Sequence, residues 1–165
     1  MREPDRAYHR QPMREKKKII FFIGIGLMLF SAAAMRLRQP MPRREITFGG
    51  RQMRVWVAET SRARQQGLSG QRTLGEDEGM VFLFPTPARH RFWMYDMHFA
   101  IDILWIRKGY VVDIAHDVLP PPDSVAVKDL PLYTPRLPAD VVLEVRAGTA
   151  AKEDVRIGDM VGGLL

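Results

Sequence analysis

Ile101-Asp-Ile-Leu-Trp-Ile-Arg107, Lys108-Gly109 and Tyr110-Val-Val-Asp-Ile-Ala115 follow one another in this chain and decide its fold. Both long runs are rich in β-branched and aromatic residues, which favour strands. A two-residue spacer that ends in glycine separates them, as in a tight hairpin. The stretch therefore predicts a β-hairpin, and the chain around it is expected to form a β domain.

A second hairpin is predicted on the N-terminal side, with strands over Glu45–Phe48 and Gln52–Ala58. Gly49-Gly50 between them supplies the positive φ angles that a two-residue turn requires. Apolar residues alternate with Arg54 and Trp56 in its second strand. Such alternation indicates that one face of the strand is buried.

Further apolar runs predict the remaining strands. Gly79–Phe84 is almost continuously apolar and is expected to be a strand buried on both faces, stopped by Pro85 and Pro87. The other predicted strands are Arg91–Met97, Val141–Val145 and a short one over Ile157–Val161.

Two short helices and a long loop complete the expected elements. Thr60 and Thr149 are suited to cap helices that run to about Gly67 and Asp154. Six prolines between Leu119 and Pro138 exclude regular structure there. The predicted fold class is mostly β (α+β), a small antiparallel barrel or sandwich of about seven strands with two short helices.

Charge is divided unevenly along the 165 residues. Residues 1–44 carry 11 Lys and Arg against three Asp and Glu, a net charge of +8, whereas residues 45–165 carry 14 against 16, a net charge of −2. Because the downstream domain has no basic surplus, nucleic acid is not expected as a partner. Cysteine is absent, which excludes disulfides, thiolate catalysis and zinc–thiolate or iron–sulfur sites.

An apolar segment, residues 19–35, follows a basic lead over residues 1–18. It is either a transmembrane anchor or the hydrophobic region of a signal peptide that is cleaved after Ala34. Under both interpretations residues 36–44 are a tether, and residues 45–165 are an extracytoplasmic domain. The domain is then expected on the inner membrane, facing the periplasm, or secreted if cleavage occurs, and the membrane is the partner of residues 19–35.

Several motifs together resemble one known family. They include Gly67-Leu-Ser-Gly-Gln-Arg72, Asp77-Glu-Gly-Met-Val-Phe-Leu-Phe84, Phe92-Trp-Met94, Ile101-Asp102-Ile103, Val142-Leu-Glu144 and Gly158-Asp-Met-Val161. Their order and spacing, from about Val55 to Val161, resemble the small prokaryotic family known as domain of unknown function 192.

The resemblance implies a compact β-rich domain, often carried behind a signal peptide or an anchor, and it implies no activity. This chain departs from the family after the Phe-Trp-Met motif, where Lys and Asn are usual and Tyr95-Asp96 stands instead. If this segment lines a pocket, its charge is reversed, and a cationic ligand is favoured over an anionic one.

Polar residues cluster around Asp96, His98 and Asp102, with Asp113 and His116 on the next predicted strand. On one extended chain Asp96, His98 and Asp102 would share a face and could form an acid/base or hard-metal site. The competing interpretation is that Asp102 accepts backbone hydrogen bonds while the other side chains face solvent.

Other polar sets favour structural roles. His90, Met94, Met97 and His98 are ligand types that copper uses, and Trp93 could lie over the ion. Strand geometry spreads these residues apart, however, and core packing explains Met94 and Trp93 more simply. Ser69 has half of a nucleophile motif, and Glu76-Asp-Glu78 is acidic without a calcium-loop spacing. Arg72 and Glu144 are expected to form a structural ion pair.

The leading functional hypothesis is a binding or interaction module without a cofactor or metal and with an unknown ligand. Trp93, Asp96, His98 and Asp102 are its candidate groove residues, and the loop over residues 119–138 is its rim. The alternative is an envelope-glycan hydrolase or lyase with Asp96 and Asp102 as carboxylates and His98 as a proton carrier. That enzyme needs two carboxyl groups that face one cleft, whereas a binding module needs an exposed aromatic side chain.

Overall fold

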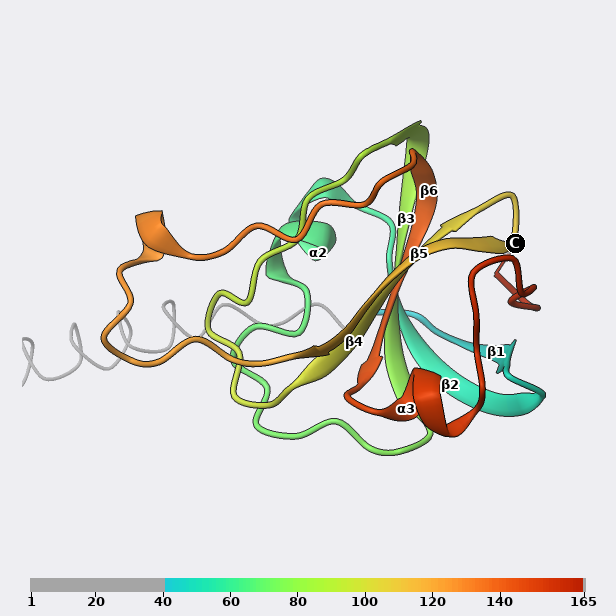
Figure 1. Ribbon diagram of the computed structural model, residues 1–165, viewed down its shortest axis with the longest axis horizontal. Helices are drawn as coiled ribbons and strands as arrows, with labels where there is room; N and C mark the ends of the chain where they lie inside the picture. Colours follow the sequence, from blue (N-terminus) through green and yellow to red (C-terminus); the bar gives the residue numbers. More distant parts are fainter. Residues whose placement is uncertain (1–40, 165) are drawn as a thin grey trace, which may run out of the picture. The chain divides into compact units, whose positions relative to one another are not determined.

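The computed structural model describes residues 41–164, whose body is one six-stranded sheet in the order β1-β2-β3-β6-β4-β5 (Figure 1). Its elements are β1 (Arg43–Phe48), β2 (Arg51–Ala58), α2 (Ser61–Gln66), β3 (Glu78–Ala88), β4 (Ile101–Arg107), β5 (Tyr110–Val118), the 3-10 turn η1 (Val127–Asp129), β6 (Ala139–Arg146) and α3 (Thr149–Lys152). The mostly β fold class with two short helices is confirmed. The apolar segment over residues 19–35 lies outside the described residues.

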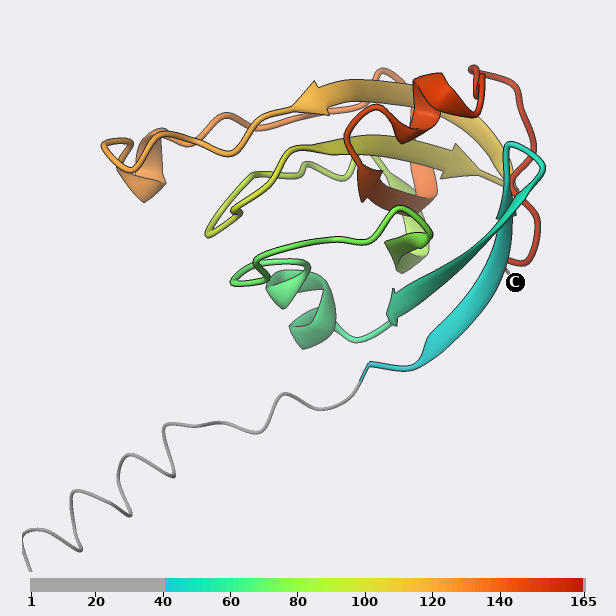
Figure 2. The ribbon, with the colours of Figure 1, turned by 90° about the horizontal axis from the view of Figure 1, so that it is seen from below.

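The sheet is strongly bent, with β4 and β5 across the top of Figure 2 and β1 and β2 below them. β1 and β5 are its edges and do not pair with each other, so the sheet is not closed into a barrel. Neighbouring strands are antiparallel except β2 and β3, which run parallel. Within residues 41–164, no helix is long and apolar enough to cross a membrane.

Both predicted hairpins are confirmed. β1 pairs with β2 around Gly49 and Gly50, whose φ angles are 57° and 81°. At Gly49 an added Cβ would lie 2.8 Å from the carbonyl oxygen of Glu153, so this turn packs too closely for a larger residue. β4 pairs with β5 through Lys108 and Gly109, which also have positive φ.

The helix between β2 and β3 has the ends that its sequence predicts. The Oγ1 atom of Thr60 accepts a hydrogen bond of 3.1 Å from the backbone N–H of Ala63. Gly67 ends the helix with a φ of 50°. The connection that contains α2 allows β3 to run parallel to β2. The hairpin signals in the sequence did not indicate this parallel pairing.

β3 does not stop at Pro85, contrary to the prediction, but continues through Pro87 to Ala88. The pairing with β2 ends at Phe82, and the pairing with β6 shifts between Leu83 and Ala88. The prolines lie in this shifted, edge-like part of the strand, where a missing N–H breaks no regular ladder.

The strand predicted over Arg91–Met97 is wrong. Phe92 alone forms an isolated bridge, to Tyr133, and Asp96 has a φ of 53° within a turn. Phe92, Met94 and Met97 are buried, which produced the strand-like pattern. Both edges of β4 are already paired, with β5 and with β6, so this segment cannot pair with the strand that follows it in the chain.

Two smaller predictions near the C-terminus also need correction. Thr149 is the first residue of α3 and not its cap, a position that Gly148 takes with a φ of 81°. Residues 157–161 are not a strand but a connector between the two sheet edges. Met160 bridges Tyr110 of β5, and Gly162 bridges Thr47 of β1. The connector satisfies backbone groups of both edges without closing the sheet.

The two faces of the sheet bury separate apolar clusters. One cluster includes Ile46, Phe48, Met53, Val55, Leu104, Ile106, Leu143 and Val145. The other includes Leu68, Leu74, Met80, Phe82, Phe92, Met94, Met97, Ile101, Ile103, Trp105 and Val142. β4 is buried from Ile101 to Ile106 because it contributes to both clusters.

Candidate ligand-binding surface

Residues 93–98, here called the aromatic turn, present two large rings to solvent. Trp93 is 44% exposed and Tyr95 is 43% exposed. Their ring centroids lie 5.5 Å apart at an interplanar angle of 31°. By contrast Trp105, the other tryptophan considered for a binding role, is buried and donates its indole N–H to the carbonyl oxygen of His90. Trp93 therefore provides the kind of accessible aromatic side chain that a binding module requires.

Backbone contacts hold the aromatic turn in place. The Ser69 hydroxyl donates to the carbonyl oxygen of Tyr95 at 2.8 Å, and the N–H of Gly70 donates to the carbonyl oxygen of Asp96 at 2.8 Å. Phe92 and Tyr133 exchange backbone hydrogen bonds just before the turn. Tyr133 of the loop over residues 119–138 therefore lies beside the base of the turn.

Asp96 and His98 lie together at the surface. Their carboxylate oxygen and Nε2 atom are 3.7 Å apart, and both side chains are 52% exposed. At this distance the contact is an ion pair only when the imidazole is protonated, and the separation exceeds hydrogen-bonding length. The turn therefore combines two aromatic rings, a solvated carboxylate and an imidazole.

Asp102 does not join this group, because its side chain is fully buried. One carboxylate oxygen accepts hydrogen bonds from the N–H groups of Asp117 at 2.9 Å and Gly148 at 3.3 Å, and the other accepts from Ala150 at 2.9 Å. Asp102 therefore connects β4 to the end of β5 and to the start of α3. This arrangement matches the structural interpretation of Asp102.

Asp113 and His116 also make no hydrogen bond or ion pair with the aromatic turn in the described part of the chain. Asp113 is bound by the Arg136 side chain at 2.7 Å and by the Arg136 backbone N–H. Burial alone would raise the pKa of Asp113, but the hydrogen bonds from Arg136 outweigh it and lower the pKa below its usual value. His116 is exposed at the surface of β5. Asp113 therefore anchors the long loop.

A hollow of about 400 Å³, here called the arginine hollow, opens near the C-terminal end of β6. Its lining residues are Arg72, Thr73, Leu74, Phe99, Ala100, Arg146 and Ala147. Neither Arg72 nor Arg146 makes a hydrogen bond or ion pair with any residue of the described part of the chain. The predicted Arg72–Glu144 ion pair is therefore wrong.

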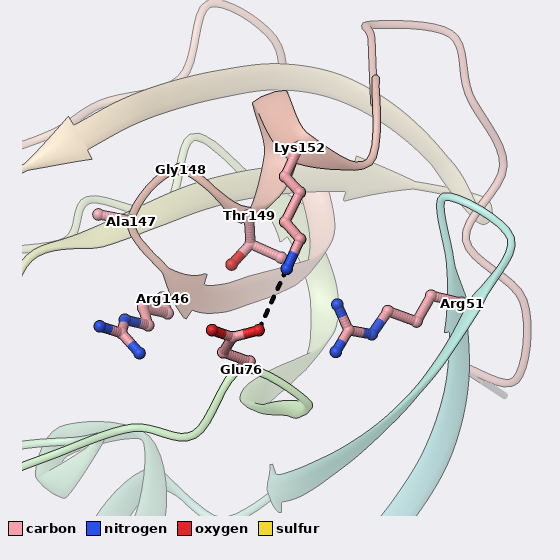
Figure 3. A pocket seen from close by; sticks show the side chains of 7 residues that line it. All are labelled: Arg51, Glu76, Arg146, Ala147, Gly148, Thr149 and Lys152. Carbon is pink, nitrogen blue, oxygen red and sulfur yellow. Dashed lines mark hydrogen bonds and ion pairs between the residues drawn. The ribbon is translucent and has the colours of Figure 1, made fainter.

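A smaller hollow of about 140 Å³ shares Arg146 and Ala147 with the arginine hollow. Figure 3 shows its lining, with Glu76 lying between Arg146 and Arg51. Glu76 accepts a hydrogen bond of 3.1 Å from Lys152. That contact lowers the pKa of Glu76, and the charges of Arg146 and Arg51 lower it further. The carboxylate of Glu76 thus supplies the negative charge that faces the basic side chains of this smaller hollow.

Glu144 is a buried acid on β6, 5% exposed, between Met80 of β3 and Ile103 of β4 in the register. It has no hydrogen bond or ion pair within residues 41–164. Burial raises its pKa to about 8, so the carboxyl group is mostly protonated at neutral pH. Arg72 is exposed on the loop between α2 and β3, whereas Glu144 is buried in the sheet.

Metal-binding arrangements are not found in the described region. No group of three or more His, Cys, Asp and Glu side chains there could hold a metal ion. In the acidic stretch at residues 76–78, Glu76 pairs with Lys152, Asp77 pairs with Arg51, and Glu78 accepts the N–H of Gly75. These contacts give the stretch a structural role at the turn before β3.

Two parts of this surface are not apparent from the sequence. Tyr95 differs from the usual family residue, but the sequence does not indicate that its ring lies beside that of Trp93. In the predicted strand the two side chains would share a face but would be separated along the strand. Arg146 was not singled out at all. Its position at the end of an apolar strand was a usable signal, because a charge there often lies at the rim of a core.

The bent sheet and its loops define a small β-rich domain class that is shared with known proteins. The family model described as DUF192, Uncharacterized ACR, matches residues 44–163, and the chain therefore belongs to the DUF192 family. A search of the curated proteins finds no match.

Two solved structures are similar to this chain. One, from Sinorhizobium meliloti 1021, is described as a candidate transcription regulator; it is 26% identical, with a TM-score of 0.67 over 76% of this chain and 97% of that one. The other is a protein of unknown function from Novosphingobium aromaticivorans DSM 12444. It is 27% identical, with a TM-score of 0.61 over 73% of this chain and 84% of that one.

Proposed function

We propose that this DUF192 protein is a binding module that holds a cationic group of its ligand at the aromatic turn. The observation that carries the proposal is the exposed Trp93–Tyr95 pair, with centroids 5.5 Å apart, beside the solvated carboxylate of Asp96. Large exposed rings cost solvation free energy and are rarely retained side by side without a partner.

The chemistry of the turn favours an ammonium or guanidinium group. Tryptophan and tyrosine attract such cations to their ring faces, with about 0.5–2 kcal/mol for each favourable contact. The carboxylate of Asp96 adds a charge of the complementary sign. Tyr95 and Asp96 stand where the family usually has Lys and Asn, and they convert this segment from basic to acidic.

The alternative glycan hydrolase is less well supported by the geometry. Two carboxyl groups would have to face one cleft, about 5–10 Å apart, with one able to donate or accept a proton. Asp102 is fully buried and already accepts three backbone hydrogen bonds. Asp96 therefore lacks the second catalytic carboxylate that this mechanism assigned to Asp102.

The binding proposal predicts that Trp93→Ala weakens binding of a cationic probe. We expect the full chain to bind tetralysine, and its dissociation constant to rise about 3–30-fold in the variant, because one cation–π contact is lost. Isothermal titration calorimetry measures both constants. Tetraglutamate is the charge-reversed probe and is expected not to bind at the turn.

Tyr110→Ala is the matched control, because Tyr110 is 51% exposed at the tip of another hairpin. Its tetralysine affinity should equal that of the wild type. Equal loss of affinity in both variants, or no tetralysine binding by the wild type, would contradict the assignment of the site.

We also propose that residues 19–35 carry the domain out of the cytoplasm, as an anchor in the inner membrane or as a cleaved signal peptide. The uninterrupted apolar run behind a basic lead supports this proposal. A reporter enzyme that is active only outside the cytoplasm, fused to the C-terminus, is expected to be active. It should become inactive when residues 19–35 are deleted.

N-terminal sequencing of the mature protein separates the two forms of this proposal. A new N-terminus at Met35 indicates cleavage after Ala34, and an intact start indicates an anchor. An inactive reporter on the full chain, with the protein present at normal amounts, would rule out export altogether.

A further inference from the structure

We propose that the arginine hollow is a second binding site, which takes an oxyanion, the carboxylate or phosphate group of a small ligand, between Arg72 and Arg146. Its lining shares no residue with the aromatic turn, although Phe99 directly follows the turn in the chain, and the proposal does not depend on what the turn binds.

The two arginines reach the hollow from different parts of the chain. Arg72 lies on the loop between α2 and β3, and Arg146 is the last residue of β6. Both are exposed, and neither has a hydrogen-bonding or ion-pairing partner within residues 41–164. Other arginines near this end of the sheet are neutralised, as Arg51 is by Asp77 and Glu153.

The chemistry of the lining suits an oxyanion on a partly apolar ligand. A guanidinium group offers planar, paired donors that match the oxygens of a carboxylate or phosphate. The hydroxyl group of Thr73 is a further donor in the lining, and Leu74 and Phe99 supply apolar wall. A volume of about 400 Å³ is within the range of small-molecule sites.

Two carboxyl groups, those of Glu76 and Glu144, bear on the positive charge of the hollow. Glu76, in the adjoining smaller hollow, is bound to Lys152, although Arg146 also acts on it at longer range. Glu144 lies two residues before Arg146 and therefore on the same face of β6. Its neighbours in the register, Met80 and Ile103, are apolar, and its carboxyl group is mostly uncharged at neutral pH.

Thermal unfolding of the full chain tests the site with two probes, inorganic phosphate and acetate, each replacing chloride at constant ionic strength. Binding to the folded state raises the melting temperature in a saturable way. We expect this rise in the wild type, and at least a tenfold weaker apparent affinity in Arg72→Gln and Arg146→Gln. A response to one probe only identifies whether carboxylate or phosphate is preferred.

The control is Arg62→Gln, which removes the same charge from an exposed position on α2. Phosphate stabilises many proteins without a site, so the deciding quantity is the difference between Arg146→Gln and Arg62→Gln. Arg146→Lys keeps the charge but loses the paired donors, and an intermediate affinity is expected. The proposal is overturned if Arg146→Gln and Arg62→Gln respond equally, or if the wild type shows no saturable response.

Discussion

Replacement of Asp102 by asparagine is expected to lower the free energy of unfolding by about 2–4 kcal/mol, because hydrogen bonds to a buried charge are lost. The carboxylate accepts from the N–H groups of Asp117, Gly148 and Ala150. An asparagine side chain keeps one acceptor oxygen and places an N–H₂ group against at least one of these donors.

The loss should be large because Asp102 joins three elements at once. Asp117 has a φ angle of 50°, a left-handed conformation that is costly for a residue other than glycine and needs support from its surroundings. Without the carboxylate, the end of β5 and the β6–α3 turn lose the group that holds them to β4. Chemical denaturation of the full chain, followed by circular dichroism, measures the change.

Asp123→Asn is the matched control for this experiment, because Asp123 is exposed on the long loop. Its stability should stay within about 0.5 kcal/mol of the wild type. Tetralysine binding by Asp102→Asn should be preserved under conditions where the variant is folded. Unchanged stability together with lost binding would show that Asp102 acts in the ligand site and not in the fold.

Replacement of Glu144 by glutamine is expected to have the opposite effect and to stabilise the protein at alkaline pH. Burial raises the folded-state pKa of Glu144 from 4.5 to about 8. The folded state therefore retains a proton that the unfolded state releases. The free energy of unfolding is therefore highest below about pH 4.5, where Glu144 is protonated in both states. It falls progressively as the pH rises from there through 8.

Glutamine carries no titrating group, so the variant escapes this loss. The stability difference between Glu144→Gln and the wild type should move in favour of the variant by about 3–4 kcal/mol from pH 5 to pH 9. Denaturation curves at several pH values measure this change. The pH-dependent difference is the relevant quantity, because burial of an amide adds an offset that does not depend on pH.

Glu59→Gln is the control for the second experiment, since Glu59 is exposed just before α2. It should show the same pH dependence as the wild type. A Glu144→Gln variant whose stability follows the wild type in parallel from pH 5 to pH 9 would mean that the carboxyl group is ionised in the folded protein. Such a result would also remove one support for the charge of the arginine hollow.

Local signals in the sequence predicted much of the fold. Gly49-Gly50 and Lys108-Gly109 mark both hairpins, and Thr60 and Gly67 mark the ends of α2. Each of these signals depends on residues that are close along the chain. Turn conformations and helix caps are therefore readable without knowledge of the tertiary structure.

The wrong strand prediction over residues 91–97 shows what local sequence patterns cannot predict. Its alternating pattern arises because Phe92, Met94 and Met97 pack into the core from a turn. A strand needs a free neighbour as well as a pattern, and β4 has none to offer. The extended geometry that would have aligned Asp96, His98 and Asp102 therefore does not exist.

The sequence by itself determined the β-rich class, the hairpins and the family, because these follow from turn residues, alternation and motif spacing. Only the tertiary structure decided which polar side chains are accessible. In the folded protein Asp102 is buried and accepts three backbone hydrogen bonds. Trp93 and Tyr95 lie side by side at the surface, and Arg72 lines the same hollow as Arg146. Burial and charge pairing depend on contacts between distant segments, and such contacts leave no local pattern to read.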